Sequence, residues 1–425
     1  VNLKTLEVAF NRTCQLACSY CNPAFSSTWV KDIRNNGGYQ GIKSDARGHF
    51  IDDAPYAEPF DDLESNPYKD AFWRWWPELC KELEEIRVTG GEPLMTPDIY
   101  QLFDWFETTD EPNKEHMRFA INSNLMAKES LLNKLIEGTQ NINRFHLYTS
   151  CEAYGKQAEY IRDGLKWDIW TKHFERICSE ARIEGLHMMM TINALCLDTI
   201  TEFLDWVMEM KRKYGHNMPG ISVNILRFPS FQSPLTLPDN LRKMYHDEIL
   251  TWLENVRAKA ETDSEGRLLL ADWEQDQLSR LIEYLDVVKT PHRNTADRTL
   301  LEHDFKVFYE QYDARRFMNF KETFPRLADF YDNIQLMEID KNEDVQAPKT
   351  SGVKDGLFAK RIVTEDGEVK VVEMKMRGRK TGESDEWYDN PLDPEARAEL
   401  MKKIGGSSIG WDTETDGLGG AEDGK

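Results

Sequence analysis

The segment Cys14-Gln15-Leu16-Ala17-Cys18-Ser19-Tyr20-Cys21 decides how the rest of this sequence is interpreted. It carries three cysteines in the pattern C-x3-C-x2-C, directly after an apolar run (Leu6, Val8, Phe10) that is typical of a strand. Such short steps can bring thiolates together around one soft metal centre. A structural zinc site is closed by four ligands, whereas an iron–sulfur cubane held by three cysteines leaves one iron open to another ligand.

The remaining cysteines and the histidines leave two kinds of metal site open. A zinc site would need a remote fourth ligand, either Cys80 or one of the nine histidines, but zinc ligands usually come as two short pairs and the sequence has no second pair. The other cysteines, Cys151, Cys178 and Cys196, lie far apart, and the total of seven is odd. This usage favours a reducing, cytoplasmic location over a disulfide framework.

The net charge of the chain disfavours some classes of partner. The chain has 425 residues and a formal net charge of −22 at pH 7, and such a field repels nucleic acid and anionic membranes. No run of about 18 apolar residues occurs, so we expect no membrane span. The first residues have neither the charged start nor the apolar core of a secretory signal.

Residues 5–230 alternate between strand and helix patterns. The expected strands are 6–10, 85–89, 118–122, 144–149, 187–193 and 221–228, and the clearest helices between them are 97–107, 129–137 and 198–213. The run 188–192 is almost wholly apolar, which suits a strand covered on both faces. Six β-then-α units predict an α/β fold with a parallel sheet, curved into a partial, TIM-like (β/α)6 barrel.

Polar residues follow four consecutive expected strands. They are Gly90-Gly91-Glu92-Pro93, Asn122-Ser123-Asn124, Ser150-Cys151-Glu152 with Arg162 shortly after, and Thr191 with Asn193. Each group alone is typical of a turn or a helix cap. Together they would line the C-terminal edge of the sheet, where α/β folds bind ligands and where the three cysteines also lie.

Two regions depart from simple alternation. About 60 residues separate Cys21 from the second strand, and we interpret this insertion, about 22–83, as a flap beside the site, with a surface loop as the alternative. Its tryptophans, Trp73, Trp75 and Trp76, fit helix packing better than substrate stacking. After residue 231, helical patterns cover about 239–258, 269–288 and 297–318, and a hairpin is expected at 358–364 and 368–376 around Asp366-Gly367.

At this point the sequence resembles the radical SAM (radical S-adenosylmethionine) superfamily. C-x3-C-x2-C with Tyr20 before the third cysteine, and the Gly-Gly-Glu after the next strand, carry the match. It looks closest to the branch with a small "twitch" extension, by Asn22-Pro23-x-x-Ser26-Ser27-x-Trp29 and by Leu226-Arg227-Phe228-Pro229. The resemblance suggests a core at 1–231 and a helical twitch-like extension at 232–335. The residue pattern and composition alone predict a hairpin-containing region at 336–404 and a disordered acidic tail at 405–425.

The resemblance also implies a role for each site residue. Cys14, Cys18 and Cys21 would hold a [4Fe–4S] cluster whose open iron is chelated by the methionine part of S-adenosylmethionine. An electron passed into the sulfonium would release a deoxyadenosyl radical, which abstracts a substrate hydrogen. The residues expected to bind S-adenosylmethionine are Gly91 and Glu92 at its amino group, Arg162 at its carboxylate, Ser150 and Asn193 at the ribose or methionine end, and Tyr20 and Leu226 beside adenine.

The same resemblance leaves the substrate open. A peptide or protein side chain is the first hypothesis for the substrate, and a small metabolite or nucleotide base is the alternative. A separate, less favoured hypothesis is that the protein is not an enzyme but a zinc-stabilised binding protein. A flavodoxin- or ferredoxin-like protein would supply the electron. The last cysteine is Cys196, so the second half has no thiolates for an auxiliary cluster. Cys151 stands where an acid is usual, either as a substrate-facing thiol or as a small buried residue.

Overall fold

The computed structural model describes residues 3–57, 66–215, 218–291 and 295–337, and the two strands 357–363 and 369–375. The chain divides into two compact units, Val1–Asp340 and Lys341–Lys425. None of the helices in the described part of the chain is both long and apolar enough to cross a membrane.

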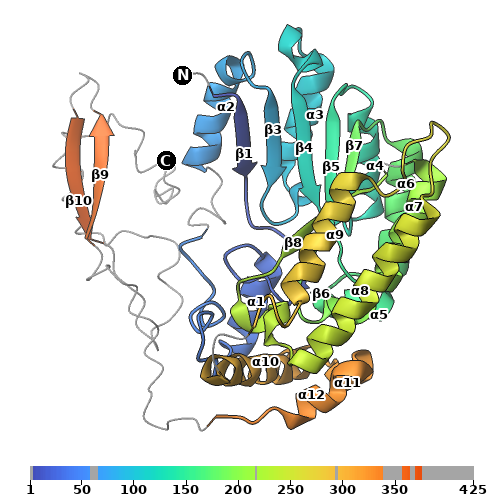
Figure 1. The fold of residues 1–425 in the computed structure, drawn as a ribbon. Coiled ribbons are helices and arrows are strands. Elements are labelled where there is room, and N and C mark those ends of the chain that lie inside the picture. Colours follow the sequence, from blue (N-terminus) through green and yellow to red (C-terminus); the bar gives the residue numbers. More distant parts are fainter. Residues whose placement is uncertain are drawn as a thin grey trace. The chain divides into compact units, whose positions relative to one another are not determined.

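A six-stranded sheet organises the first unit (Figure 1). Its strands, in spatial order, are β1 (Thr5–Ala9), β3 (Glu85–Thr89), β4 (Arg118–Ser123), β5 (Phe145–Ser150), β7 (Gly185–Ile192) and β8 (Gly220–Ile225). Every pairing is parallel, which confirms the α/β class and the six expected strands. β1 and β8 occupy opposite edges of the sheet, and its barrel-like curvature stays a prediction.

Helices connect the strands. They are α1 (Ser27–Asn36), α2 (Pro67–Leu79), α3 (Pro97–Thr108), α4 (Glu129–Thr139), α5 (Gly155–Ile161), α6 (Trp167–Glu180) and α7 (Ile200–Tyr214). In Figure 1, α3 and α4 lie behind the sheet, and aromatic packing explains why. Phe103 of α3 contacts Phe119 of β4 and Phe145 of β5, with ring centroids 5.5 and 6.1 Å apart. This face of the sheet is the apolar core of the unit.

The other face of the sheet is polar. In β7 the residues alternate between buried Met188 and Met190 and half-buried Met189 and Thr191. The strand is therefore fully covered on one face and only partly covered on the other, short of the coverage on both faces that its apolar run suggested. Side chains on the partly exposed face include Glu85, Arg87, Arg118, Tyr148 and His187. A sheet with one apolar and one polar face leaves the polar face available to a ligand.

The edge strand β8 is covered by a helix of the C-terminal extension. Glu274 Oε1, on α9 (Asp272–Leu285), accepts a hydrogen bond from the Ile221 backbone N–H at 2.7 Å, and Gln277 Oε1 accepts from the Val223 N–H at 2.7 Å. Glu274 also forms a buried ion pair with Lys211 of α7 at 2.9 Å. These side chains form hydrogen bonds with edge-strand N–H groups that could otherwise pair with another strand.

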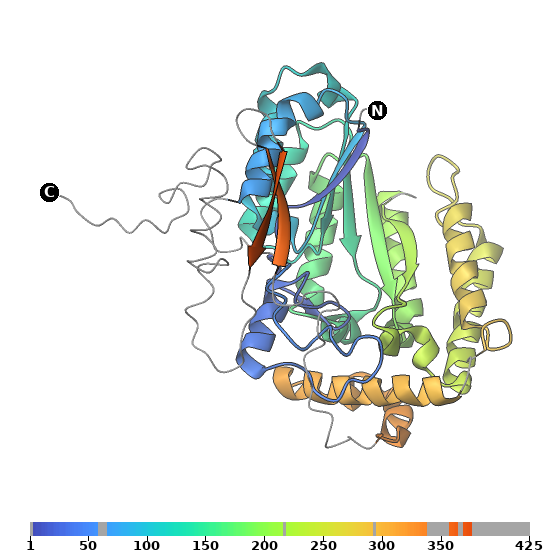
Figure 2. The same cartoon turned by 90° about the vertical axis from the view of Figure 1, so that its left-hand side faces the viewer.

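The extension is helical where it is described. Besides α9 it contains α8 (Asp239–Lys259), α10 (Thr295–Arg316), α11 (Phe320–Thr323) and α12 (Ala328–Asn333), so the three long helices are confirmed, with α9 shorter than expected. Figure 2 shows α10 below the sheet, crossing under its C-terminal edge. The second unit contains the expected hairpin, with β9 (Leu357–Val363) and β10 (Val369–Lys375) antiparallel. Asp366-Gly367 and the tail 405–425 lie outside the described residues, and the finer domain division stays a prediction.

Candidate functional site

The cysteine loop leaves the end of β1 and is held on one side by the first turn of α1. Ser27 Oγ accepts a hydrogen bond from the Cys14 N–H at 3.1 Å, and Thr28 Oγ1 donates to the Cys14 carbonyl at 2.6 Å. Trp29 Nε1 donates to the Cys18 carbonyl at 3.0 Å. The insertion therefore begins with the helix that shapes the cysteine loop.

Residues far along the chain hold the other side of the loop. A short antiparallel pair, β2 (Ala17–Cys18) with β6 (Arg162–Asp163), fixes the backbone at the second cysteine. The hydroxyl of Tyr312, on α10, donates to the Ala17 carbonyl at 3.2 Å, and Gln232 Nε2 donates to the Ser19 carbonyl at 2.9 Å. The loop is thus fixed from the core, the insertion and the extension.

The three thiols of the loop are free, half-buried and close enough to influence one another electrostatically. The pKa of Cys14 is raised to about 12, chiefly by burial and then by the neighbouring Cys18. Burial raises the pKa of Cys21 as well, followed by the effects of Cys18 and Cys14. A metal centre deprotonates the thiols that bind it, so this grouping of otherwise protonated thiols suits a cationic centre.

Gly91 brings the second strand-end loop against the cysteine loop. The Gly91 N–H donates to the Asn11 carbonyl at 3.2 Å, and the Glu92 N–H donates to the Thr13 carbonyl at 2.7 Å. A Cβ atom on Gly91 would lie 2.3 Å from the Thr13 oxygen, so only glycine allows this approach. The Gly-Gly-Glu stretch therefore lies beside the cysteines, as the sequence suggested.

The Glu92 side chain is directed inward. Its carboxylate accepts hydrogen bonds from Ser123 Oγ at 2.8 Å, the Asn124 N–H at 2.7 Å and the Leu94 N–H at 3.1 Å. Burial raises its pKa to about 7, and the hydrogen bonds oppose that shift. Glu92 thus joins the ends of β3 and β4.

Asn124 belongs to the site although it was not among the predicted ligand residues. Its Nδ2 lies 3.6 Å from Cys14 Sγ, and its Oδ1 accepts from Gln15 Nε2 at 2.9 Å. Its place at the end of the third strand was visible in the sequence, but nothing there indicated contact with a cysteine.

Arg162 and Glu152 form a buried ion pair beside the cysteines. Arg162 Nε and Nη2 donate to the two carboxylate oxygens at 3.2 and 2.6 Å, and Arg162 Nη1 lies 3.8 Å from Cys18 Sγ. The Tyr20 hydroxyl donates to Glu152 Oε1 at 3.1 Å. The structure therefore brings Tyr20, Arg162 and Cys18 together, with Glu152 as the internal partner of the guanidinium.

The remaining predicted residues lie at strand ends. Ser150 is half-buried at the end of β5. Asn193 is fully buried, and its Oδ1 accepts from the Leu195 and Cys196 N–H groups, which makes it the cap of the turn after β7. The Leu226 N–H donates to the Ile192 carbonyl at 2.8 Å, extending the β7–β8 pairing.

The structure decides between the alternatives given above for Cys151 and for the insertion. Cys151 is fully buried and contacts the Ala153 carbonyl, so the small buried residue is confirmed. Trp29 and Phe50 of the insertion are also fully buried, so it is not a surface loop in that part. Of its tryptophans, Trp76 is buried and Trp73 stacks on Phe10, which confirms helix packing for these two, whereas Trp75 is 49% exposed.

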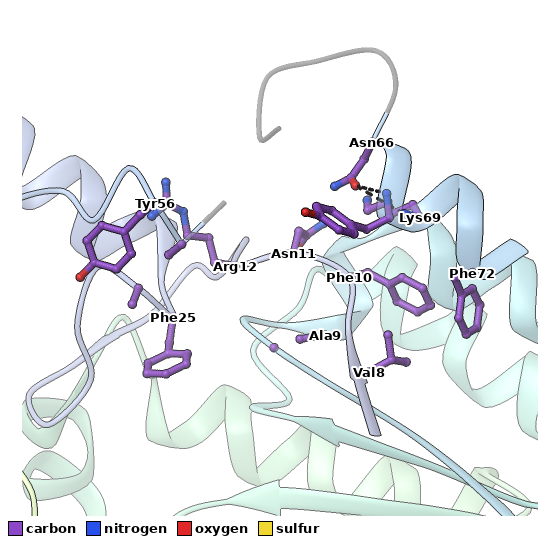
Figure 3. Close-up of a pocket in the computed structure, with 14 residues that line it drawn as sticks. Val8, Ala9, Phe10, Asn11, Arg12, Phe25, Tyr56, Asn66, Lys69 and Phe72 are labelled. Carbon is purple, nitrogen blue, oxygen red and sulfur yellow. Dashed lines mark hydrogen bonds between the residues drawn. The ribbon is translucent and has the colours of Figure 1, made fainter. Parts of the chain in front are cut away.

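A cavity of about 520 Å³ opens beside the end of β1, between α2 and the earlier part of the insertion around Phe25 and Tyr56 (Figure 3). Aromatic side chains line it, including Phe10, Phe25 and Tyr56, together with the cations Arg12 and Lys69. Both cations have internal partners. Arg12 Nη1 donates to three backbone carbonyls, the shortest bond being 2.8 Å, and Lys69 pairs with Asp98 at 2.9 Å. The sequence offered no signal for this cavity.

Across the described ranges, no three His, Cys, Asp or Glu side chains converge where one metal ion could bind them together. An iron–sulfur cluster differs, because each thiolate binds its own iron and the three sulfurs need not meet at one point. Three cysteine thiolates are therefore a donor set that fits an iron–sulfur cluster.

This chain shows only weak similarity to known proteins. No model of a known family matches this sequence, and no curated protein matches it. Among solved structures, SuiB of Streptococcus suis bound to its precursor peptide SuiA is 14% identical with a TM-score of 0.38, over 66% of this chain and 52% of SuiB. SuiB bound to S-adenosylmethionine is 14% identical with a TM-score of 0.34, over 63% and 49% of the two chains.

A further match is native anSMEcpe with bound AdoMet and Cp18Cys peptide, which is 12% identical with a TM-score of 0.31 over 79% of this chain and all of that one. The matched part spans about half the length of SuiB. Because these TM-scores are low, the proposed function is argued from the residues of this chain and not from the similarity.

Proposed function

We propose that this protein is a radical SAM enzyme, in which Cys14, Cys18 and Cys21 hold a [4Fe–4S] cluster. The observation that carries the proposal is a loop of three free thiols at the C-terminal end of β1, with its backbone held by the first turn of α1. When bound, the cluster and S-adenosylmethionine would supply a deoxyadenosyl radical that abstracts hydrogen from a substrate.

The chain's own residues would shape and shield that centre. Ser27, Thr28 and Trp29 hold the loop backbone, so the thiols are pre-positioned before a cluster arrives. Arg162 keeps Nη1 directed at Cys18, and a guanidinium has five N–H donors, so its bonds to Glu152 leave donors for a carboxylate. We therefore retain Arg162, with Gly91, Glu92, Ser150, Asn193, Tyr20 and Leu226, as the proposed S-adenosylmethionine contacts.

The proposed substrate is a peptide or protein side chain presented over the polar face of the sheet. That face carries half-buried polar groups across β3, β4, β5 and β7, which suits an extended, hydrogen-bonding substrate. A flavodoxin- or ferredoxin-like protein is the proposed electron donor, the twitch-like extension the proposed cover, and the cytoplasm the proposed location.

The test is S-adenosylmethionine cleavage by anaerobically reconstituted protein with dithionite. The wild-type protein should form deoxyadenosine, Cys18→Ala should form none, and Cys178→Ala, which changes a half-buried cysteine on α6, should behave like wild type. Cleavage by Cys18→Ala at the wild-type rate would remove the basis for the cluster assignment. A colourless protein with one zinc per chain would favour the binding-protein alternative.

A further inference from the structure

Three planar side chains, Arg87, Tyr148 and His187, form a stack on the polar face of the sheet. The Arg87 guanidinium lies 4.4 Å from the centroid of the Tyr148 ring. Tyr148 stacks on His187 at 4.4 Å with an interplanar angle of 18°, and the His146 ring lies parallel to the His187 ring, with its centroid 5.3 Å away and an angle of 5°. The stack crosses from β3 to β7, and nothing in the proposed cluster chemistry uses it.

Two glycines make room for the imidazoles. A Cβ atom on Gly185 would lie 2.8 Å from both His146 Nδ1 and His187 Nε2. A Cβ atom on Gly220, directly across from His187 in β8, would lie 3.7 Å from His187 Nδ1. Both rings therefore lie close over the strand backbones, with His187 Nδ1 turned toward β8.

The hydrogen bonds among these groups run in one direction. Glu184 Oε2 lies 2.7 Å from His146 Nε2, and His146 Nδ1 lies 3.0 Å from His187 Nε2. A carboxylate only accepts, so His146 carries a proton on Nε2, and in its neutral form it accepts at Nδ1. His187 must then donate from Nε2, which leaves its Nδ1 as an unprotonated base.

The surroundings keep both imidazoles neutral. The pKa of His187 is lowered to about 4, chiefly by burial and then by the charges of His146, Arg118 and Arg87. Burial also lowers the pKa of His146, which Glu184 opposes. At the outer end of this hydrogen-bonded series the environment is more open, because the Glu184 side chain is 40% exposed to solvent.

The bare nitrogen also lies within reach of a ligand at the cysteine loop. The Tyr20 hydroxyl interacts with the Thr191 side chain. His187 lies four residues before Thr191 on the same face of β7, about 13 Å away at roughly 3.3 Å per residue. A ligand over the polar face could thus meet the cysteine loop at one end and His187 at the other.

We propose that His187, His146 and Glu184 form a proton relay, in which His187 Nδ1 accepts a proton from an O–H or N–H group of a ligand bound over the polar face. The ligand's bond to hydrogen breaks with its electron pair staying on the ligand, and an N–H bond forms at Nδ1. The Nε2 proton of His187 then passes to His146 Nδ1, and the Nε2 proton of His146 passes to Glu184 and water. The inference rests on the proposed function only in taking this ligand to be the enzyme's substrate.

The first test reads the tautomers by nitrogen NMR of ¹⁵N-histidine-labelled protein without S-adenosylmethionine or reductant. At pH 7 both His146 and His187 should be neutral and protonated on Nε2. His146→Phe keeps a flat ring but cannot accept a hydrogen bond, so His187 should then populate both tautomers. A His187 protonated on Nδ1 in the wild type, or an unchanged tautomer in His146→Phe, would overturn the relay.

The second test measures access to the base with diethylpyrocarbonate and peptide mass spectrometry. His187 should be modified, whereas His173, which is buried with both ring nitrogens hydrogen-bonded, should not. The rate at His187 should stay level from pH 8 to pH 5, while free N-acetylhistidine slows below about pH 6.5. Protection of His187, or a pH profile like that of the free amino acid, would contradict the proposal. Both tests stand whether or not the protein cleaves S-adenosylmethionine.

Discussion

Removing the Glu152 carboxylate should destabilise the first unit strongly. Arg162 and Glu152 have 5% and 1% exposed side chains, and two hydrogen bonds at 3.2 and 2.6 Å join them. Breaking a buried pair leaves an uncompensated charge, which typically costs about 3–5 kcal/mol. With a urea m-value of about 3 kcal/mol/M, Glu152→Ala should lower the unfolding midpoint by about 1 M or more.

Two further variants make this measurement decisive. Asp332→Ala removes the partner of Lys321 in an exposed pair, 3.0 Å apart, and should cost about 0–1 kcal/mol. Glu152→Ala combined with Arg162→Met removes both buried charges and should recover much of the loss. If Glu152→Ala unfolds at the same urea concentration as Asp332→Ala, the buried pair does not hold the site together as described.

Three other expectations follow from packing and charge. The pKa of His187 is about 4 in the folded state and about 6.5 in the unfolded state, so the neutral ring contributes to the free energy of unfolding above pH 6.5 and this contribution is lost as the pH falls. Between pH 7 and pH 4.5 the free energy of unfolding of His187→Gln should therefore fall by about 2 kcal/mol less than that of the wild type, as measured by urea titration. Gly185→Ala should cost about 1–3 kcal/mol and separate the two imidazoles, visible as altered histidine NMR signals. Lys211→Met should cost about 3–5 kcal/mol by calorimetry or urea, with much of it restored when Glu274→Gln is added; a smaller loss in the single variant would show that the pair is solvated.

Much of the fold was predictable because its signals are local. The strands are short apolar runs and the long helices have a clear helical period, so β3 and α8 were expected within a residue or two of their positions. The pairing of β2 with β6 was missed because two-residue strands have no periodicity.

The site was predictable in type but not in its connections. The cysteine spacing and the Gly-Gly-Glu loop are local patterns, and the structure places them side by side. The pairing of Arg162 with Glu152, and of Asn124 with Cys14, depends on which strand ends meet in space. The stack of Arg87, Tyr148 and His187 depends on strand register in the same way, since its members are 61 and 39 positions apart.

The most direct measurement is the electron paramagnetic resonance spectrum of the reduced, reconstituted protein with and without S-adenosylmethionine. The account predicts about four irons per chain and a cluster signal that shifts when S-adenosylmethionine is added, because one iron has no cysteine ligand. An iron-free protein, or a cluster signal that S-adenosylmethionine leaves unchanged, would contradict it.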